Sequence, residues 1–213
     1  WALRAVGPEP RPPRPLAPSS SGEEAAPDPP TAPSPEARVA ATRGVLIHRL
    51  LERLPELGEA DRPGAATKWL SRAAAHLGEP DRDEIARAAL AVLGDPQWAE
   101  VFGPDSLPEV PIAAMVGGRV IAGTIDRLVL GAEIIRIVDY KTARRPPESL
   151  AQVPPAHIRQ MAAYAAALQA IHPAMRVEAG LLYTQAPRMI AIPAEVLEAH
   201  KPGSEPLQES YPA

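Results

Sequence analysis

The sequence of 213 residues contains no cysteine. This absence excludes a disulfide framework, a thiolate zinc site, an iron–sulfur cluster and a cysteine nucleophile. A metal ion would therefore have to be held by carboxylates, histidines, carbonyl groups and water. Long apolar runs are absent as well, since none approaches the ~18 residues of a membrane span. We therefore expect no membrane partner. No Gly-x-x-x-x-Gly-Lys phosphate loop occurs either, so we expect no ATP site in this chain.

Proline is unevenly distributed, because 11 of the 28 prolines fall within residues 1–35. Such a chain is semi-rigid and extended, and we expect it to form neither helix nor sheet. We therefore predict that residues 1–35 are a tether to a preceding domain, with a passive tail as the alternative. The start, which lacks an initiator methionine and a leader pattern, suggests a piece of a longer polypeptide. Residues 36–213 are expected to form one domain, with a helical part at 36–107 and a catalytic core at 108–200.

The spacing of apolar residues predicts an α/β fold with extra helices at its N-terminal side. Helices are expected at 35–54, 63–77, 81–93, 154–171 and 193–200, and a single turn of helix at 97–102. β-Branched, partly alternating segments predict a three-stranded antiparallel meander at 109–116, 119–130 and 133–142. Two further strands are expected at 177–184 and 189–192, which makes a mixed sheet flanked by helices.

The net charge of −4 would by itself argue against a nucleic-acid partner. The charges are unevenly spread, however: residues 36–109 hold 9 basic and 13 acidic side chains, whereas residues 110–190 hold 9 basic and 5 acidic ones. The second segment is therefore basic. We expect its arginines to contact phosphate groups, namely Arg119, Arg127, Arg144, Arg145 and Arg159.

Two carboxylates and a lysine are expected to converge on the meander. Asp139 and Lys141 are two residues apart in one strand and therefore share a face. If the preceding hairpin turns in two residues, Asp126 lies opposite Ile137 on that same face; a four-residue loop keeps this parity and a three-residue loop breaks it. Two carboxylates can hold a hard cation such as Mg²⁺, and the lysine can orient water or offset charge in phosphoryl transfer. The alternative is a salt bridge at a strand end.

Three residues outside the meander add to this pattern. His48 lies on the apolar first helix, where a histidine is more often a core residue, although its imidazole could supply a third metal contact. Gln160 and Tyr164 are four residues apart on the helix after Lys141 and share a face. Alone, that spacing is common on polar helix surfaces.

In this order, the residues resemble the RecB-type PD-(D/E)XK nucleases. That pattern has His on a first helix, Asp in a Gly-x-Ile-Asp strand, Asp-x-Lys on the next strand and then Gln-x-x-x-Tyr, and it covers about residues 36–192. Here Gly123-Thr-Ile-Asp126 replaces a literal Pro-Asp. Within the group, the sequence looks most like the C-terminal nuclease domain of AddA-type helicase–nucleases, through Gly-Val-Leu-Ile-His-Arg-Leu-Leu-Glu, Glu-Val-Pro-Ile and Val-Asp-Tyr-Lys-Thr.

This resemblance implies a metal-dependent deoxyribonuclease with Mg²⁺, or Mn²⁺, as its cofactor. The metal ligands would be the side chains of His48, Asp126 and Asp139 and the backbone carbonyl of Tyr140. No iron–sulfur cluster is expected, because the branches of this fold that hold one use four cysteines.

The same resemblance implies further roles and partners. Lys141 would be catalytic together with Asp126 and Asp139, while Gln160 and Tyr164 would act around the active site and the DNA. The substrate would be single strands from unwound DNA ends in double-strand-break repair. The partners would be helicase domains upstream in the same polypeptide and an AddB-type subunit, in the bacterial cytoplasm.

Two other functions remain open from the residues alone. One is a non-catalytic DNA- or protein-interaction module with an inactive nuclease fold, in which the Asp–Lys pair is only an ion pair. The other is a Mg²⁺ phosphohydrolase for small substrates, which would predict acidic clusters on several loops where only one is apparent.

Overall fold

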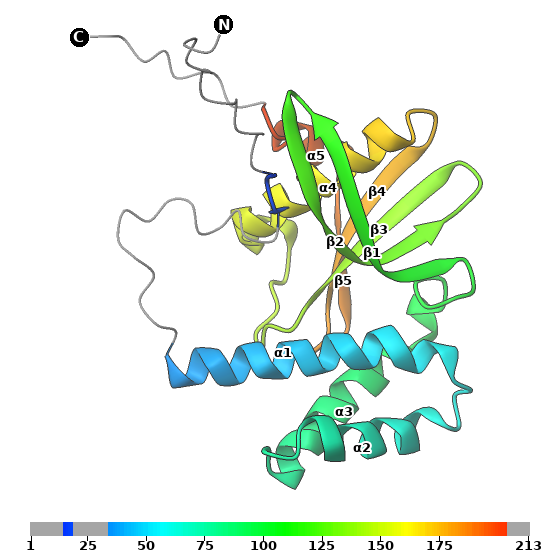
Figure 1. Ribbon diagram of the computed structural model, residues 1–213, viewed down its shortest axis with the longest axis vertical. Helices are drawn as coiled ribbons and strands as arrows, with labels where there is room; N and C mark the ends of the chain where they lie inside the picture. The colour runs from blue at the N-terminus through cyan, green and yellow to red at the C-terminus, as the bar shows by residue number, and fades with distance from the viewer. Residues whose placement is uncertain (1–14, 19–33, 204–213) are drawn as a thin grey trace, which may run out of the picture.

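The computed structural model of the chain describes residues 15–18 and 34–203 (Figure 1). Its α-helices are α1 (Pro35–Arg53), α2 (Arg62–Ala73), α3 (Glu79–Leu93), α4 (Pro155–Ile171) and α5 (Ala194–Ala199). Its strands are β1 (Ser106–Val116), β2 (Arg119–Leu130), β3 (Ile134–Lys141), β4 (Arg176–Tyr183) and β5 (Arg188–Ile192). The predicted elements are present, and the turn of helix expected at 97–102 is a 3₁₀ turn at Pro96–Trp98.

The five strands form one mixed sheet in the order β1-β2-β3-β4-β5. The pairs β1/β2, β2/β3 and β4/β5 are antiparallel, whereas β3 and β4 are parallel and joined through α4. This confirms the expected fold class, including the antiparallel meander and the helices before it. In the described residues no helix is both long and apolar enough to cross a membrane.

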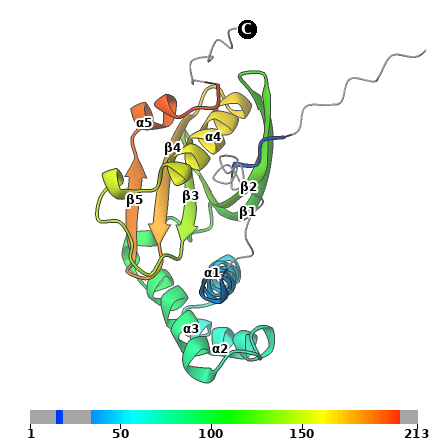
Figure 2. The ribbon, with the colours of Figure 1, turned by 90° about the vertical axis from the view of Figure 1, so that its left-hand side faces the viewer.

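Helices pack against the sheet in two places (Figure 2): α4 and α5 lie against one face, whereas α1, α2 and α3 lie together at the end of the sheet where β3 and β4 finish. One core lies between the sheet and α4 with α5, and it contains Ile135, Ile137 and Leu181. The other lies between the sheet and the layer of α1, α2 and α3, where Val138 and Leu182 are buried. Because side chains alternate along a strand, neighbouring residues of β3 belong to different cores.

The two hairpins of the meander set its register. Gly117 and Gly118 have φ angles of +54° and +75°, which glycine adopts readily in a two-residue turn. In the second hairpin, four residues separate the paired Leu130 and Ile135. This loop has the even length that keeps the predicted parity of the following strand.

A short part of the proline-rich stretch contacts the sheet. Leu16 forms an isolated parallel bridge with Ile121, in which its N–H donates to the carbonyl of Val120 at 2.7 Å and its own carbonyl accepts from Ala122 at 3.1 Å. The expectation that no part of residues 1–35 joins a sheet is therefore wrong at Leu16, because this length of β2 is not paired with β3 and leaves a free edge. Most of the predicted tether lies outside the described residues.

Candidate active site

Strands β2 and β3 part at the level of Asp126. Their ladder reaches the pair Arg127 and Val138, and the next residues in this register are Asp126 and Asp139. At this point Asp126 Oδ2 accepts a hydrogen bond from the backbone N–H of Tyr140 at 2.7 Å. A side-chain carboxylate thus takes the place of a ladder carbonyl and keeps the N–H of Tyr140 satisfied.

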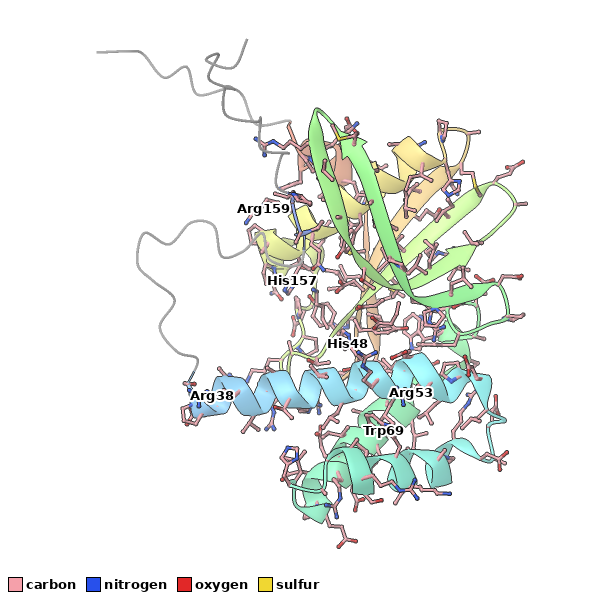
Figure 3. All side chains as sticks on the ribbon, in the orientation of Figure 1. Arg38, His48, Arg53, Trp69, His157 and Arg159 are labelled. Atoms are coloured by element: carbon pink, nitrogen blue, oxygen red, sulfur yellow. The ribbon has the colours of Figure 1, made fainter. Side chains whose placement is uncertain are left out.

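Helix α1 brings His48 to this opening (Figure 3). Ser34 caps the helix by accepting from the N–H of Ala37 at 3.2 Å, and Pro35 occupies its first turn. His48 Nδ1 lies 3.6 Å from Asp126 Oδ2, and Nε2 lies 3.2 Å from the carbonyl oxygen of Tyr140. The structure therefore gathers three of the four predicted ligands, namely His48, Asp126 and the carbonyl of Tyr140.

Asp139, Lys141 and Gln160 form a closed set of contacts on the α4 side of β3. Asp139 is only 6% exposed. Its Oδ2 lies 2.8 Å from Lys141 Nζ, and its Oδ1 accepts from Gln160 Nε2 at 2.9 Å. Lys141 Nζ in turn donates to Gln160 Oε1 at 3.0 Å. Gln160 thus links the carboxylate to the ammonium, which explains why a polar side chain is buried on α4.

Tyr164 approaches the same region from the next turn of α4. A Cβ atom at Gly123 would lie 2.8 Å from the Tyr164 hydroxyl and 2.9 Å from its ring, closer than packed atoms allow. The glycine of Gly123-Thr-Ile-Asp126 is therefore needed for close contact between α4 and β2. Gln160 and Tyr164 both lie against site strands, as their shared helix face predicted.

Negative charge is crowded at this opening. Burial, and then the charge of Asp126, raise the pKa of Asp139 to about 6, although Lys141 and His48 oppose the rise. Burial would lower the pKa of His48, but the hydrogen bond and charge of Asp126, together with the charges of Asp139 and Glu109, raise it above its ordinary value. Both shifts indicate a place where a positive charge is favoured.

The donor set fits a hard divalent cation. Carboxylate and carbonyl oxygens with one imidazole suit Mg²⁺ or Mn²⁺, and the buried Asp139 Oδ2 has only the ammonium of Lys141 as its partner in the described part of the chain. Within residues 15–18 and 34–203, no three His, Cys, Asp or Glu side chains lie close enough together to hold an ion by themselves. A site here would therefore draw on the carbonyl of Tyr140 and on water.

Glu109 is a site residue to which sequence reasoning assigned no role. The register of β1 and β2 places it opposite Asp126, between the pairs Pro108–Arg127 and Val110–Ile125. Its φ angle of +49° is unusual for a residue with a side chain. Burial, and then the charges of Asp126 and Glu52, raise its pKa. Counting back from the Gly117-Gly118 turn would have revealed this pairing.

Arg127 lies inside the molecule and not on the DNA-facing surface. It is 3% exposed, and it donates from Nε to the Tyr140 hydroxyl at 3.1 Å and from Nη2 to the carbonyl of Leu51 at 2.8 Å. That carbonyl lacks its helical partner because residue 55 is proline, which has no N–H. The guanidinium also lies 5.0 Å from the ring of Phe102.

The prediction that Arg127 contacts phosphates is therefore wrong, because its side chain joins the helical layer. It links β2 with α1 and with Tyr140 of β3, which are the three elements that carry the predicted ligands. The other arginines named for phosphate contact are exposed, and their role stays a prediction: Arg119, Arg144, Arg145 and Arg159.

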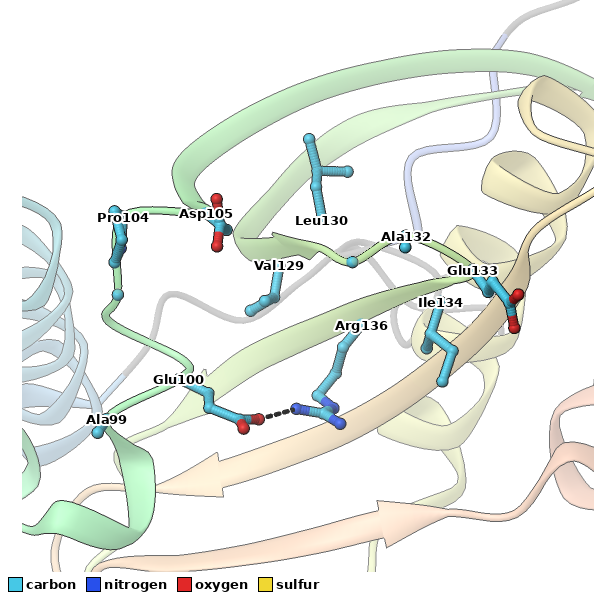
Figure 4. A pocket seen from close by; sticks show the side chains of 12 residues that line it. Ala99, Glu100, Pro104, Asp105, Val129, Leu130, Ala132, Glu133, Ile134 and Arg136 are labelled. Atoms are coloured by element: carbon cyan, nitrogen blue, oxygen red, sulfur yellow. Dashed lines mark hydrogen bonds and ion pairs between the residues drawn. The ribbon is translucent and has the colours of Figure 1, made fainter.

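A hollow of about 720 Å³ lies elsewhere, at the hairpin between β2 and β3 (Figure 4). Its floor is apolar, with Val129, Leu130 and Ile134, and its rim holds the ion pair of Glu100 and Arg136 at 3.2 Å. None of the predicted site residues lines it. The predicted metal and catalytic residues therefore lie at the other end of the β2–β3 ladder, where the two strands part at Asp126, and not in this hollow.

Comparisons with known proteins agree with the sequence pattern. The profile of the PD-(D/E)XK nuclease superfamily matches residues 22–209. Among solved structures, the crystal structure of SSO0001 is similar, with 18% identity and a TM-score of 0.30 over 71% of this chain and 70% of that chain. No curated protein matches. The match of the profile over most of the sequence shows that the chain belongs to the PD-(D/E)XK nuclease superfamily.

Proposed function

We propose that this chain is a metal-dependent nuclease domain that hydrolyses phosphodiester bonds of DNA. The observation that carries the proposal is the gathering of Asp126, Asp139 and Lys141 where β2 and β3 part. Membership of the nuclease superfamily supports the reaction class. The exposed arginines and the basic balance of residues 110–190 support a nucleic-acid substrate.

We propose that His48, Asp126, Asp139 and the carbonyl of Tyr140 hold Mg²⁺ or Mn²⁺. When bound, the ion would supply Lewis-acid activation of water and of the phosphate. The chain supplies the rest. Asp126 fixes the backbone of Tyr140, and Gln160 orients the Asp139 carboxylate.

Lys141 has the properties of a catalytic group in this arrangement. Its side chain is only 15% exposed, so its ammonium lies in a poorly solvated place beside the carboxylate of Asp139. Charge that develops on a phosphate during hydrolysis would be stabilised there more strongly than in water.

We further propose that the domain belongs to an AddA-type helicase–nuclease acting in double-strand-break repair. The phrases around His48, Glu109 and Asp139 support this assignment, as does the proline-rich stretch before the domain. The helicase domains of the same polypeptide, an AddB-type subunit and single strands from unwound DNA would then be its partners.

The test is cleavage of a labelled single-stranded oligodeoxynucleotide by the purified chain, in Mg²⁺ and in EDTA. We expect cleavage in Mg²⁺ that EDTA abolishes and that is lost in Asp126→Ala. Cleavage that persists in EDTA or in Asp126→Ala would contradict the metal site. DNA binding without cleavage under any of these conditions would favour the non-catalytic module.

A further inference from the structure

Two buried polar atoms near Lys141 have no hydrogen-bond partner in the described part of the chain. Five side-chain atoms of this kind occur within the described residues. The two that lie near Lys141 are the Tyr183 hydroxyl and Nδ1 of His157. Folded proteins seldom leave buried polar atoms unpaired, so these atoms are candidates for contact with a polar ligand.

Tyr183 is the most completely buried of these side chains. It is 1% exposed, and the parallel pairing of β3 and β4 places it directly beside Lys141. Both residues therefore project from the same face of the sheet, toward α4. Burial, and then the charge of Asp139, raise the pKa of Tyr183. The hydroxyl thus keeps its proton and can act as a donor.

The unpaired hydroxyl is unfavourable for folding. A buried donor without a partner loses its hydrogen bonds to water and gains none in return. A phenylalanine would fill the same space without this penalty. The hydroxyl thus contributes nothing to the fold as described, and its position beside Lys141 is accounted for if a ligand completes its hydrogen bond.

We propose that the Tyr183 hydroxyl is a catalytic group that donates a hydrogen bond to a non-bridging oxygen of the substrate phosphodiester. This inference rests on the proposed function. The hydroxyl gives up no proton: the oxygen of a water molecule forms a bond to phosphorus, the bond from phosphorus to the leaving nucleoside oxygen breaks, and a proton of that water ends on the leaving oxygen. Tyr183 only stabilises the charged non-bridging oxygen beside the Lys141 ammonium. His157 lies near the same lysine, and its pKa of about 4, caused by burial and then Lys141, leaves it uncharged at neutral pH.

The variant Tyr183→Phe tests this role. We expect its single-turnover cleavage of a single-stranded oligodeoxynucleotide in saturating Mg²⁺ to be slower by about 10- to 100-fold. Its melting temperature should equal or exceed that of the wild type, and its Mn²⁺ affinity should be unchanged. Cleavage would then become slower while the melting temperature stays the same or rises. Replacement of a purely structural tyrosine would instead lower the melting temperature.

Thr184→Val is the matched control. Thr184 is the first residue of the turn after β4, is fully buried and also has a hydroxyl without a partner in the described chain, but the proposal gives this hydroxyl no contact with the substrate. We expect this variant to melt no lower than the wild type and to cleave at the wild-type rate.

Three outcomes would overturn the inference. An active wild type together with an equally active Tyr183→Phe would remove Tyr183 from the reaction and leave the proposed nuclease function intact. A slower Tyr183→Phe with a clearly lowered melting temperature would indicate a structural role. A wild type that shows no Mg²⁺-dependent cleavage would overturn the proposed function, and the inference with it.

Discussion

The two faces of β3 place neighbouring residues under opposite conditions. On the side of the helical layer, the Tyr140 hydroxyl accepts from Arg127, its ring stacks on Phe102 at 6.2 Å, and Val138 is fully buried in the core. On the α4 side, Asp139 is held by Lys141 and Gln160, but Tyr183 of the adjacent strand β4 has a buried hydroxyl without a hydrogen-bond partner in the described chain. At this point the sheet thus has a satisfied face and an incompletely satisfied face.

One face therefore holds the surrounding elements in place, and the other carries the groups proposed to act on the substrate. The satisfied face joins α1, β2 and β3 through Arg127, so the backbone of Tyr140 and the helix of His48 keep fixed positions. The other face keeps a carboxylate, an ammonium and a phenol close together at the expense of stability. Functional groups are often held in this way, because groups that are fully paired in the fold are not available to a ligand.

The largest effect is expected on the incompletely satisfied face. Lys141→Ala should slow cleavage by about 10²- to 10³-fold, because the ammonium stabilises charge that appears during the reaction. Mn²⁺ affinity should be retained or increased, since a cation beside the metal is removed. Single-turnover kinetics and calorimetric titration with Mn²⁺ measure the two quantities.

Lys68→Ala provides the control for this lysine, because Lys68 is exposed on α2, and α1 lies between α2 and the sheet (Figure 1). It should behave as the wild type in both assays. Intact turnover of Lys141→Ala would reduce the Asp139–Lys141 contact to a simple ion pair and remove the catalytic contrast between the faces.

The satisfied face should respond mainly in stability. Arg127→Met should lower the free energy of unfolding by about 2 kcal/mol or more, because it leaves the carbonyl of Leu51 and the hydroxyl of Tyr140 unpaired in the interior. Tyr140→Phe removes only one of these contacts and should cost less. Urea unfolding measures both. A loss of cleavage without any loss of stability in Arg127→Met would show that Arg127 acts on the substrate.

Asp139 should make the metal-free protein less stable as the pH rises. Its pKa is raised from 3.8 to about 6, so the folded state holds the proton more tightly than the unfolded chain. The stability contributed by this group therefore decreases between those two values and stays low above them. In EDTA, Asp139→Asn should melt a few degrees higher than the wild type near about pH 8, with a smaller difference near about pH 5.

A lower melting temperature of Asp139→Asn near about pH 8 would mean that the contact with Lys141 outweighs burial. In that case the α4 side of β3 would be as well satisfied as the other face, and the comparison would fail.

The smallest effect is expected at Glu109. Glu109→Gln removes a charge that acts on Asp126 and His48, so Mn²⁺ affinity should decrease several-fold while the metal-free protein becomes slightly more stable. Glu59→Gln, at an exposed position, is the control for loss of an acidic side chain. Unchanged Mn²⁺ affinity in Glu109→Gln would place Glu109 outside the site.

Much of the fold followed from local patterns. The alternation of β-branched residues predicted the meander, and Ser34-Pro35 at the start of α1 and Gly117-Gly118 at the first hairpin are residues typical of such places. Such signals act between residues close in sequence, so they can be read without the tertiary structure. The bridge at Leu16 was missed because it depends on a free edge that appears only when β2 and β3 part.

The candidate site was only partly predictable. The parity that relates Asp126 to Asp139 depends on the length of one loop, and the sequence allowed it to be stated conditionally. Arg127 was misplaced because its sequence position did not show that the unpaired carbonyl of Leu51 and the ring of Phe102 would surround it.

The sequence by itself determined which donors exist and which of them share a face: two carboxylates, a lysine, a histidine and the Gln160–Tyr164 pair. The tertiary structure alone decided that Tyr183 lies beside Lys141, because parallel pairing across α4 joins residues that are far apart in the chain. It also decided which polar atoms remain unpaired. The spacing of residues in the sequence shows which side chains share a face of a strand or helix. Burial and the choice of neighbouring residues, in contrast, depend on how all the layers pack together.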